Sequence, residues 1–181
     1  KGAKPDLADP DFGITPLHVA ASSDRRPEAL EIMKRLLAAG ADPNRISDDQ
    51  AAPDSLAKTI LLNATPLETA IASNSMALEK TKLLLEHKAD PNRKDSRVSS
   101  MLGHAIGLDD PSVTDLVQVM GESGFRMTDP KLMEAAISHK NPKLIELLLK
   151  FGASPNAKDS EGNTLLAAAC FAGDAERVRL L

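Results

Sequence analysis

The chain repeats one short sequence pattern, and an internal repeat constrains the fold more than any local feature does. The pattern opens with Thr15-Pro16-Leu17-His18 and closes with Gly40-Ala41-Asp42-Pro43-Asn44. A second copy opens with Thr65-Pro66-Leu67-Glu68 and closes with Lys88-Ala89-Asp90-Pro91-Asn92, and weaker copies follow. Each unit of such an array buries its apolar surface mainly against its neighbours. The chain is therefore predicted to grow by stacking units.

Each unit carries the signals of two short helices. The threonine that opens a unit can accept a backbone hydrogen bond, and the proline after it suits the first helical position. Apolar residues then recur at helical spacing, as they do between Leu30 and Leu37. Gly40 and Gly152 stand where a second helix would end in a left-handed residue, whereas Lys88 takes that place in the second unit. The sequence therefore predicts helix pairs.

These residues resemble the ankyrin repeat, in which Thr-Pro-Leu-His precedes Gly-Ala-Asp and an asparagine. The resemblance implies an all-α solenoid of stacked helix-turn-helix units joined by β-hairpin-like loops, with about four full repeats and partial units at both ends. On this resemblance, residues 1–181 form a single array. It begins with the exit turn of a preceding repeat at 1–8, followed by a repeat with a lengthened inter-helix loop at 10–44 and an insertion in the hairpin loop at 45–63. Further repeats follow at 64–92, 95–128, 129–156 and 159–181, of which the repeat at 95–128 is degenerate and the last is truncated. Both ends break off inside a repeat, so we expect this sequence to be an excerpt of a longer array.

The insertion at residues 45–63 lengthens the loop between the first two repeats. It contains an apolar segment of its own, Leu56 to Leu62. A long loop in a compact domain is usually functional or disordered. The alternative is a short extra helix that only lengthens the hairpin loop, and the sequence leaves both interpretations open.

Members of the ankyrin family hold other macromolecules. The resemblance therefore implies a protein-protein interaction scaffold that binds a protein partner on a concave face formed by hairpin tips and first helices. Interface energy concentrates in aromatic, arginine and large apolar side chains. The candidates at the family's variable positions are Phe12, Ile14, Leu61, Leu62, Arg97, Leu108 and Phe171. Phe12 and Phe171 have an alternative role, because each could pack against an adjacent loop instead of a partner.

The resemblance also implies structural roles for Thr15, His18, Gly40, Thr65, Gly152 and Thr164. The threonines would cap first helices, and the glycines would end second helices. His18 occupies the family position whose hydrogen bonds tie one unit to its neighbour. These residues are expected to hold the array together and not to contact a partner.

Composition excludes several other classes of function. The net charge of −4 gives no electrostatic reason to expect a nucleic acid partner. No apolar run approaches the roughly 18 to 20 residues that a membrane span needs. The histidines, His18, His87, His104 and His139, lack the spacing that places two metal ligands on one helical face. With no nucleophilic triad, paired catalytic carboxylates or phosphate-binding glycine loop, we expect no metal, no cofactor and no enzymatic activity.

The single cysteine, Cys170, cannot form an intramolecular disulfide, which favours a reducing, cytoplasmic location. The resemblance places it at a position of a first helix that is usually alanine, so we expect its side chain to be buried; the alternative is a reactive thiol.

A second hypothesis follows from the two truncated ends. The array could be the targeting or substrate-recruiting module of a larger enzyme or of a secreted, possibly bacterial, effector whose activity lies outside this segment. An effector would act in the host cytosol.

Overall fold

The computed structural model describes residues 2–23, 28–47, 63–73, 76–94, 96–108, 110–138, 141–159 and 161–181. Within these ranges the chain forms ten helices and one isolated β-bridge, between Lys158 and Thr164. The helices are α1 (Pro16–Ser22), α2 (Ala29–Ala38), α3 (Pro66–Ala72), α4 (Ala77–Glu86), α5 (Val98–Gly107), α6 (Val113–Glu122), α7 (Pro130–Ser138), α8 (Pro142–Lys150), α9 (Leu165–Phe171) and α10 (Ala175–Leu180). The predicted all-α class is confirmed.

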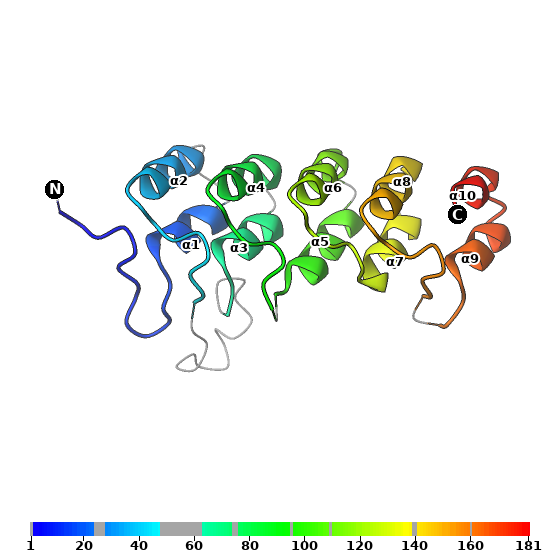
Figure 1. Ribbon diagram of the computed structural model, residues 1–181, viewed down its shortest axis with the longest axis horizontal. Coiled ribbons are helices and arrows are strands. Elements are labelled where there is room, and N and C mark those ends of the chain that lie inside the picture. The colour runs from blue at the N-terminus through cyan, green and yellow to red at the C-terminus, as the bar shows by residue number, and fades with distance from the viewer. Residues whose placement is uncertain are drawn as a thin grey trace. The chain divides into compact units, whose positions relative to one another are not determined.

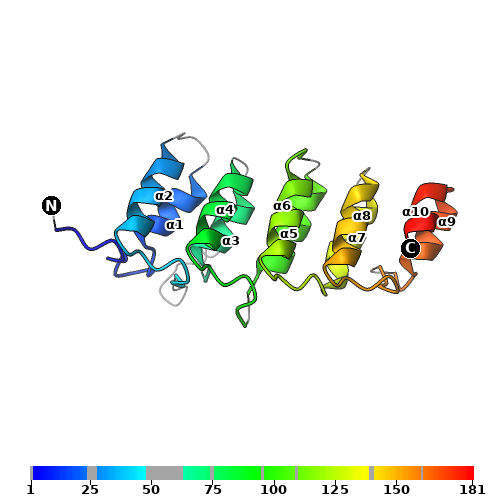
Figure 2. The same cartoon turned by 45° about the horizontal axis from the view of Figure 1, so that its top comes forward.

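The chain divides into two compact units, Lys1–Val98 and Ser99–Leu181, with the boundary at the start of α5. In the first unit α1 packs on α2 and α3, α3 packs on α4, and α2 contacts α4. In the second unit α8 contacts α6, α7 and α10, while α9 contacts α7 and α10. Within each unit the first helices of the pairs form one layer and the second helices form another (Figure 1, Figure 2).

The first helix of each early pair begins at a reciprocal cap. The Thr15 hydroxyl accepts a hydrogen bond from the backbone N–H of His18, and the His18 side chain accepts one from the backbone N–H of Thr15. Thr65 and Glu68 form the same box at the start of α3. Because two otherwise unpaired helix donors are satisfied at once, these helices can be as short as seven residues.

The second helices end in left-handed residues. Gly40 has a φ of 90° and Gly152 a φ of 100°. Lys88 has a φ of 68° at the equivalent place after α4, where Ala89 N–H still donates to the carbonyl of Leu84. A side chain in this conformation is strained relative to glycine. The backbone after α4 therefore follows the same path as after α2 and α8, although Lys88 is less favourable than glycine in this conformation.

The core of each unit is aliphatic. In the first unit Leu17, Met33 and Leu67 are almost fully buried, and Leu132 and Leu148 are fully buried in the second. The fourth pair adds an aromatic ring, since Phe151 follows α8 and lies directly against Gly121 of α6. Few aromatic residues are needed because each pair is thin and buries small side chains on both flanks.

The insertion prediction concerns mainly residues 48–62, which lie outside the described residues. The expected burial of Cys170 is wrong, because its side chain is exposed. Leu165 and Ala169, four residues apart, take the inward face of α9, so the next residue points away from it.

Candidate functional site

Successive loops of the first unit are joined by one polar side chain each. Asn44 donates from its Nδ2 to the carbonyl of Lys88 (3.0 Å), and its Oδ1 accepts from the N–H of Asp90 (2.7 Å). Asp6 accepts from the N–H of Asp42 in the same manner (2.9 Å). The bonds of Asn44 join the turn that follows α2 to the turn that follows α4.

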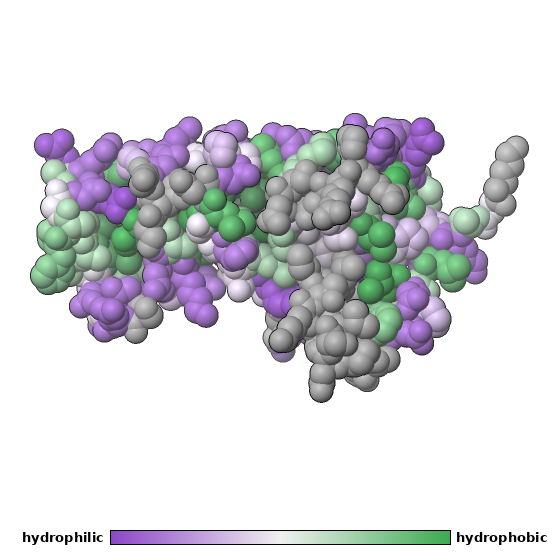
Figure 3. Space-filling model, turned by 180° about the vertical axis from the view of Figure 1, so that it is seen from behind, coloured by the Kyte–Doolittle hydropathy of each residue, from purple (hydrophilic) through white to green (hydrophobic). Residues whose placement is uncertain are grey.

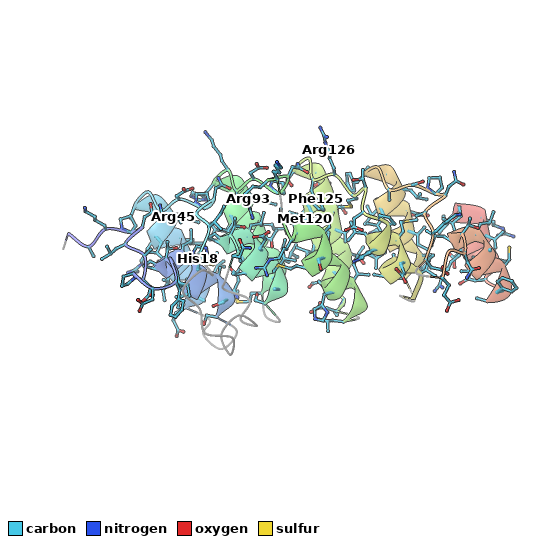
Figure 4. All side chains as sticks on the ribbon, turned by 90° about the horizontal axis from the view of Figure 1, so that it is seen from below. His18, Arg45, Arg93, Met120, Phe125 and Arg126 are labelled. Carbon is cyan, nitrogen blue, oxygen red and sulfur yellow. The ribbon has the colours of Figure 1, made fainter. Side chains whose placement is uncertain are left out.

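His18 joins α1 to the segment that precedes α3, and its side chain is completely buried. Its Nδ1 accepts from the N–H of Thr15, so the proton resides on Nε2, which lies 2.9 Å from the carbonyl oxygen of Ala64. Burial lowers the pKa of His18, because a charged imidazole would lose its hydration. The imidazole therefore acts as a neutral donor between the two pairs (Figure 4).

Glu68 stands at the equivalent position in the next pair but only accepts hydrogen bonds. Its Oε2 accepts from the N–H of Thr65 (2.7 Å), and its Oε1 accepts from Ser96 Oγ (2.9 Å) and Arg97 N–H (2.5 Å). Arg93, in the loop after α4 (Figure 4), places Nη2 3.6 Å from Oε2.

Glu68 is fully buried, and its neighbours stabilise the negative charge of its carboxylate. Burial alone would raise the pKa of Glu68, but the hydrogen bonds and the Arg93 guanidinium together outweigh it and lower the pKa. Glu68 is therefore an ionised acceptor at the place where His18 is a neutral donor.

Two basic side chains in second helices bind the ends of preceding first helices. Lys80 of α4 is 1% exposed and donates from Nζ to the carbonyl of Ser23 (2.9 Å), at the end of α1. Arg177 of α10 donates to the carbonyl of Ile137 (2.5 Å), near the end of α7. Such carbonyls lack helical partners, and a cation complements the helix dipole there. The sequence analysis did not predict these contacts of Lys80 and Arg177. The signal that could have indicated them is a basic residue within the apolar face of a helix.

The residues expected to contact a partner are distributed over both units. Phe12 and Ile14 are half-buried in the segment before α1, and Arg97 is half-buried before α5. Leu108 is 53% exposed after α5, and Phe171 is 89% exposed on α9. Leu61 and Leu62 lie outside the described residues. Phe12, Ile14 and Arg97 thus belong to the first unit, and Leu108 and Phe171 to the second.

A shallow groove runs between two first helices of the second unit. It has a volume of about 310 Å³ and is lined by Ser99, Ser100, Gly103 and His104 of α5 and by Lys131, Glu134 and Ala135 of α7. His104 lies on the side of α5 opposite to the buried Leu102 and Ile106, since successive helical residues turn by about 100°. The groove is an open surface that offers hydroxyl, imidazole and charged groups.

The described ranges contain no group of three or more His, Cys, Asp or Glu side chains placed to hold a metal ion. None of the helices in this part of the chain is both long and apolar enough to cross a membrane. Arg126 follows the buried Phe125, and its side chain extends away from α6 into solvent (Figure 4).

Comparisons with known proteins give a consistent result. A family model described as ankyrin repeats (3 copies) matches residues 1–95, and one described as ankyrin repeats (many copies) matches residues 132–181. The chain is 32% identical over 84 residues to an ankyrin repeat protein of fowlpox virus, covering 46% of this chain and 20% of the viral protein. It is 31% identical over 175 residues to the human SH3 and multiple ankyrin repeat domains protein 2, covering 92% of this chain and 8% of the human protein. The chain therefore spans a fifth or less of the length of these relatives.

Solved structures share the fold. An ankyrin repeat domain from Acinetobacter baumannii superposes with a TM-score of 0.72 at 25% identity, covering 99% of this chain and 85% of that one. The ankyrin repeat protein EF0377 gives a TM-score of 0.67 at 24% identity, covering 98% and 84%.

Proposed function

The chain belongs to the ankyrin repeat family, as its repeats predicted, and from this premise we propose that it holds a protein partner on the exposed faces of its first helices and the adjoining loops. Ankyrin repeats are in general protein-protein interaction modules. The proposal assigns the chain a binding function, without chemistry of its own, in a reducing cytoplasmic compartment.

The observation that carries this proposal is the exposure of Phe171. The chain has only four phenylalanines, and this one is 89% exposed on a first helix. An exposed aromatic ring gives up unfavourable hydration when a partner covers it, and aromatic residues are typical anchors of interfaces. Leu108, 53% exposed directly after α5, adds a second apolar contact in the same unit. The hydroxyl and charged groups of the α5–α7 groove would supply the polar rim.

Site-specific photocrosslinking tests where a partner binds. A photoreactive phenylalanine analogue is placed at Leu108 or at Phe171, and matched control probes replace Glu146 of α8 and Lys82 of α4, which are exposed on second helices. We expect the same protein band at positions 108 and 171 and none at the controls. Crosslinks confined to 82 and 146 would contradict the proposed surface.

In the first unit the proposal includes Phe12, Ile14 and Arg97, together with Leu61 and Leu62. Once a partner is identified, the double change Phe12→Ala and Arg97→Glu should weaken binding while the helical content stays unchanged by circular dichroism. The bond to Glu68 comes from the backbone N–H of Arg97, and a substitution retains it.

A second candidate function is that the array recruits a partner or substrate for a larger protein, including a secreted effector. The lengths of the relatives favour it, since this chain corresponds to 20% and 8% of them. Reading the complete open reading frame tests this candidate. A frame that encodes only further repeats and caps would rule out a recruiting module of an enzyme.

A further inference from the structure

The buried face of α4 carries two polar residues in succession, Lys80 and Thr81, which are 1% and 0% exposed. Polar residues of the second helices gather mainly on their outer side, along the top in Figure 3. The ammonium group of Lys80 donates to the carbonyl of Ser23 (2.9 Å) and to Oγ of Ser73 (3.1 Å). The hydroxyl of Thr81 has no hydrogen-bond partner among the described residues. Burial of these polar groups gives α4 less stability than apolar side chains would give.

The α8 helix shows the apolar alternative. Counted back from the left-handed residue that follows each helix, Leu144 of α8 corresponds to Lys80 and Ile145 corresponds to Thr81. Leu144 and Ile145 are both 0% exposed, and α8 contacts α6 of the preceding pair. Leucine and isoleucine at these positions are therefore sufficient to stack one helix pair on the pair before it.

The preceding pair meets Lys80 with the end of a helix. Ser23, the C-cap of α1, has an extended backbone (φ −72°, ψ 110°), and its carbonyl accepts from Lys80. Carbonyls at the C-terminal end of a helix lack helical partners and lie at the negative end of its dipole, so they stabilise a cation. An ammonium group buried without such an acceptor is strongly unfavourable. The α4 face therefore fits a neighbour that places a carbonyl opposite Lys80, and it disfavours an apolar neighbour.

We propose that Lys80 and Thr81 select the neighbour on which the α3–α4 pair stacks, at some cost in stability. The helix pairs of this chain resemble one another, and incorrect assembly is a characteristic failure of repeat proteins during folding. An apolar face could stack on a wrong pair of the same chain or of another chain. A wrong neighbour would bury the Lys80 ammonium group without an acceptor, which disfavours that arrangement. This selection acts within the array and is independent of the surface proposed for a partner.

Refolding of the 181-residue chain tests this role with two variants of identical composition. Lys80→Leu makes the buried face apolar, whereas Lys82→Leu makes the same change at an exposed position of α4. Each protein is unfolded in urea and diluted to between about 1 and 50 μM, and size-exclusion chromatography measures the recovered monomer. At the highest concentration the monomer yield of Lys80→Leu should be at least about threefold lower than that of the wild type, while Lys82→Leu stays close to the wild type.

Equilibrium unfolding in urea separates selectivity from stability. The unfolding midpoint of Lys80→Leu should equal or exceed that of the wild type, and Thr81→Ile should raise the midpoint, because each change replaces a buried polar group with an apolar one. A clearly lower midpoint for Lys80→Leu would mean that Lys80 serves stability, and it would overturn the proposal. The proposal would also fail if Lys80→Leu refolded to monomer as completely as the wild type, or if the yield of Lys82→Leu fell equally far.

Discussion

His18 and Glu68 occupy the same position in successive helix pairs, and they tie their pairs onward with opposite hydrogen-bond polarity. The Nε2 of His18 donates to the carbonyl of Ala64, whereas the carboxylate of Glu68 accepts from the N–H of Arg97 and the hydroxyl of Ser96. Both side chains also complete the cap of their own helix. The backbone groups that face positions 18 and 68 must therefore differ, with a carbonyl at the first and an N–H at the second.

This difference predicts that Glu68→His is destabilising, although histidine is the residue at position 18. A histidine capped by Thr65 N–H would hold its proton on Nε2 and direct a donor at the N–H of Arg97. Loss of the buried acceptor should lower the free energy of unfolding by roughly 2–4 kcal/mol. Urea denaturation measures the change, and Glu68→Gln, which retains one acceptor oxygen, should lose less. Equal stability of the wild type and Glu68→His would disprove the polarity argument.

The buried imidazole predicts a pH dependence of stability. Burial lowers the pKa of His18 below its ordinary value of 6.5, so the unfolded chain takes up this proton before the folded chain does. The free energy of unfolding should fall as the pH drops below 6.5, toward the lower pKa of the folded state. Denaturation between pH ~8 and ~5 should show a shallower fall for His18→Gln than for the wild type. The other three histidines are common to both proteins, so identical slopes would contradict the prediction.

Glu68 predicts a second loss of stability at lower pH. Its pKa in the folded chain is lowered from 4.5, so its stabilisation is complete above pH 4.5 and is lost as the pH falls through the folded-state value. Acid titration of the helical signal should show this phase in the wild type. The glutamine side chain of Glu68→Gln cannot ionise, so this variant should lack the acid phase. If the variant keeps the phase, other carboxyl groups cause it.

The helix pairs and the family were predictable from the sequence because their signals are local. A threonine, a proline and a glycine act within a few residues of their own positions, and the repetition of the pattern identifies the stacking. The polarity of Glu68 was not predictable, because it depends on Ser96 and Arg97, which belong to the segment before the next helix. Lys80 likewise finds its acceptor, Ser23, in the preceding pair.

The candidate binding site is less predictable than the fold. The resemblance suggests which positions vary, but the exposure of each side chain depends on its neighbours, as Cys170 and Phe171 show by being exposed in succession. The set of residues that contact a partner remains a prediction.

The left-handed residue after α4 offers a stabilising substitution. Lys88 has a φ of 68°, a conformation that glycine adopts without strain. Lys88→Gly should raise the free energy of unfolding by about 0.5–1 kcal/mol, since the native strain outweighs the added flexibility of the unfolded chain. Gly152→Ala, at a φ of 100°, is the reciprocal control and should destabilise the second unit. Thermal unfolding measures both, and a lower melting temperature for Lys88→Gly would refute the assignment of strain.

Two helical glycines of the second unit should respond in opposite directions to the same substitution. A Cβ at Gly121 would lie 2.2 Å from Cγ and Cδ2 of the Phe151 ring, whereas a Cβ at Gly103 would lie 3.8 Å from Cδ2 of Leu132. Gly121→Ala should therefore cost about 1–3 kcal/mol through overpacking. Gly103→Ala should be neutral or stabilise by up to about 1 kcal/mol, because alanine favours the helix.

The ring contact can be isolated by a double change. If Phe151 causes the cost, Gly121→Ala should destabilise much less in a Phe151→Leu background, where the side chain is smaller and can move aside. Urea denaturation of the four proteins in this cycle gives the coupling free energy, which we expect to exceed about 1 kcal/mol. If the effects of the two substitutions on the free energy of unfolding were additive, Gly121 would be required for a reason other than the Phe151 ring. The contact of Phe151 with α6 would then not determine how the α7–α8 pair packs.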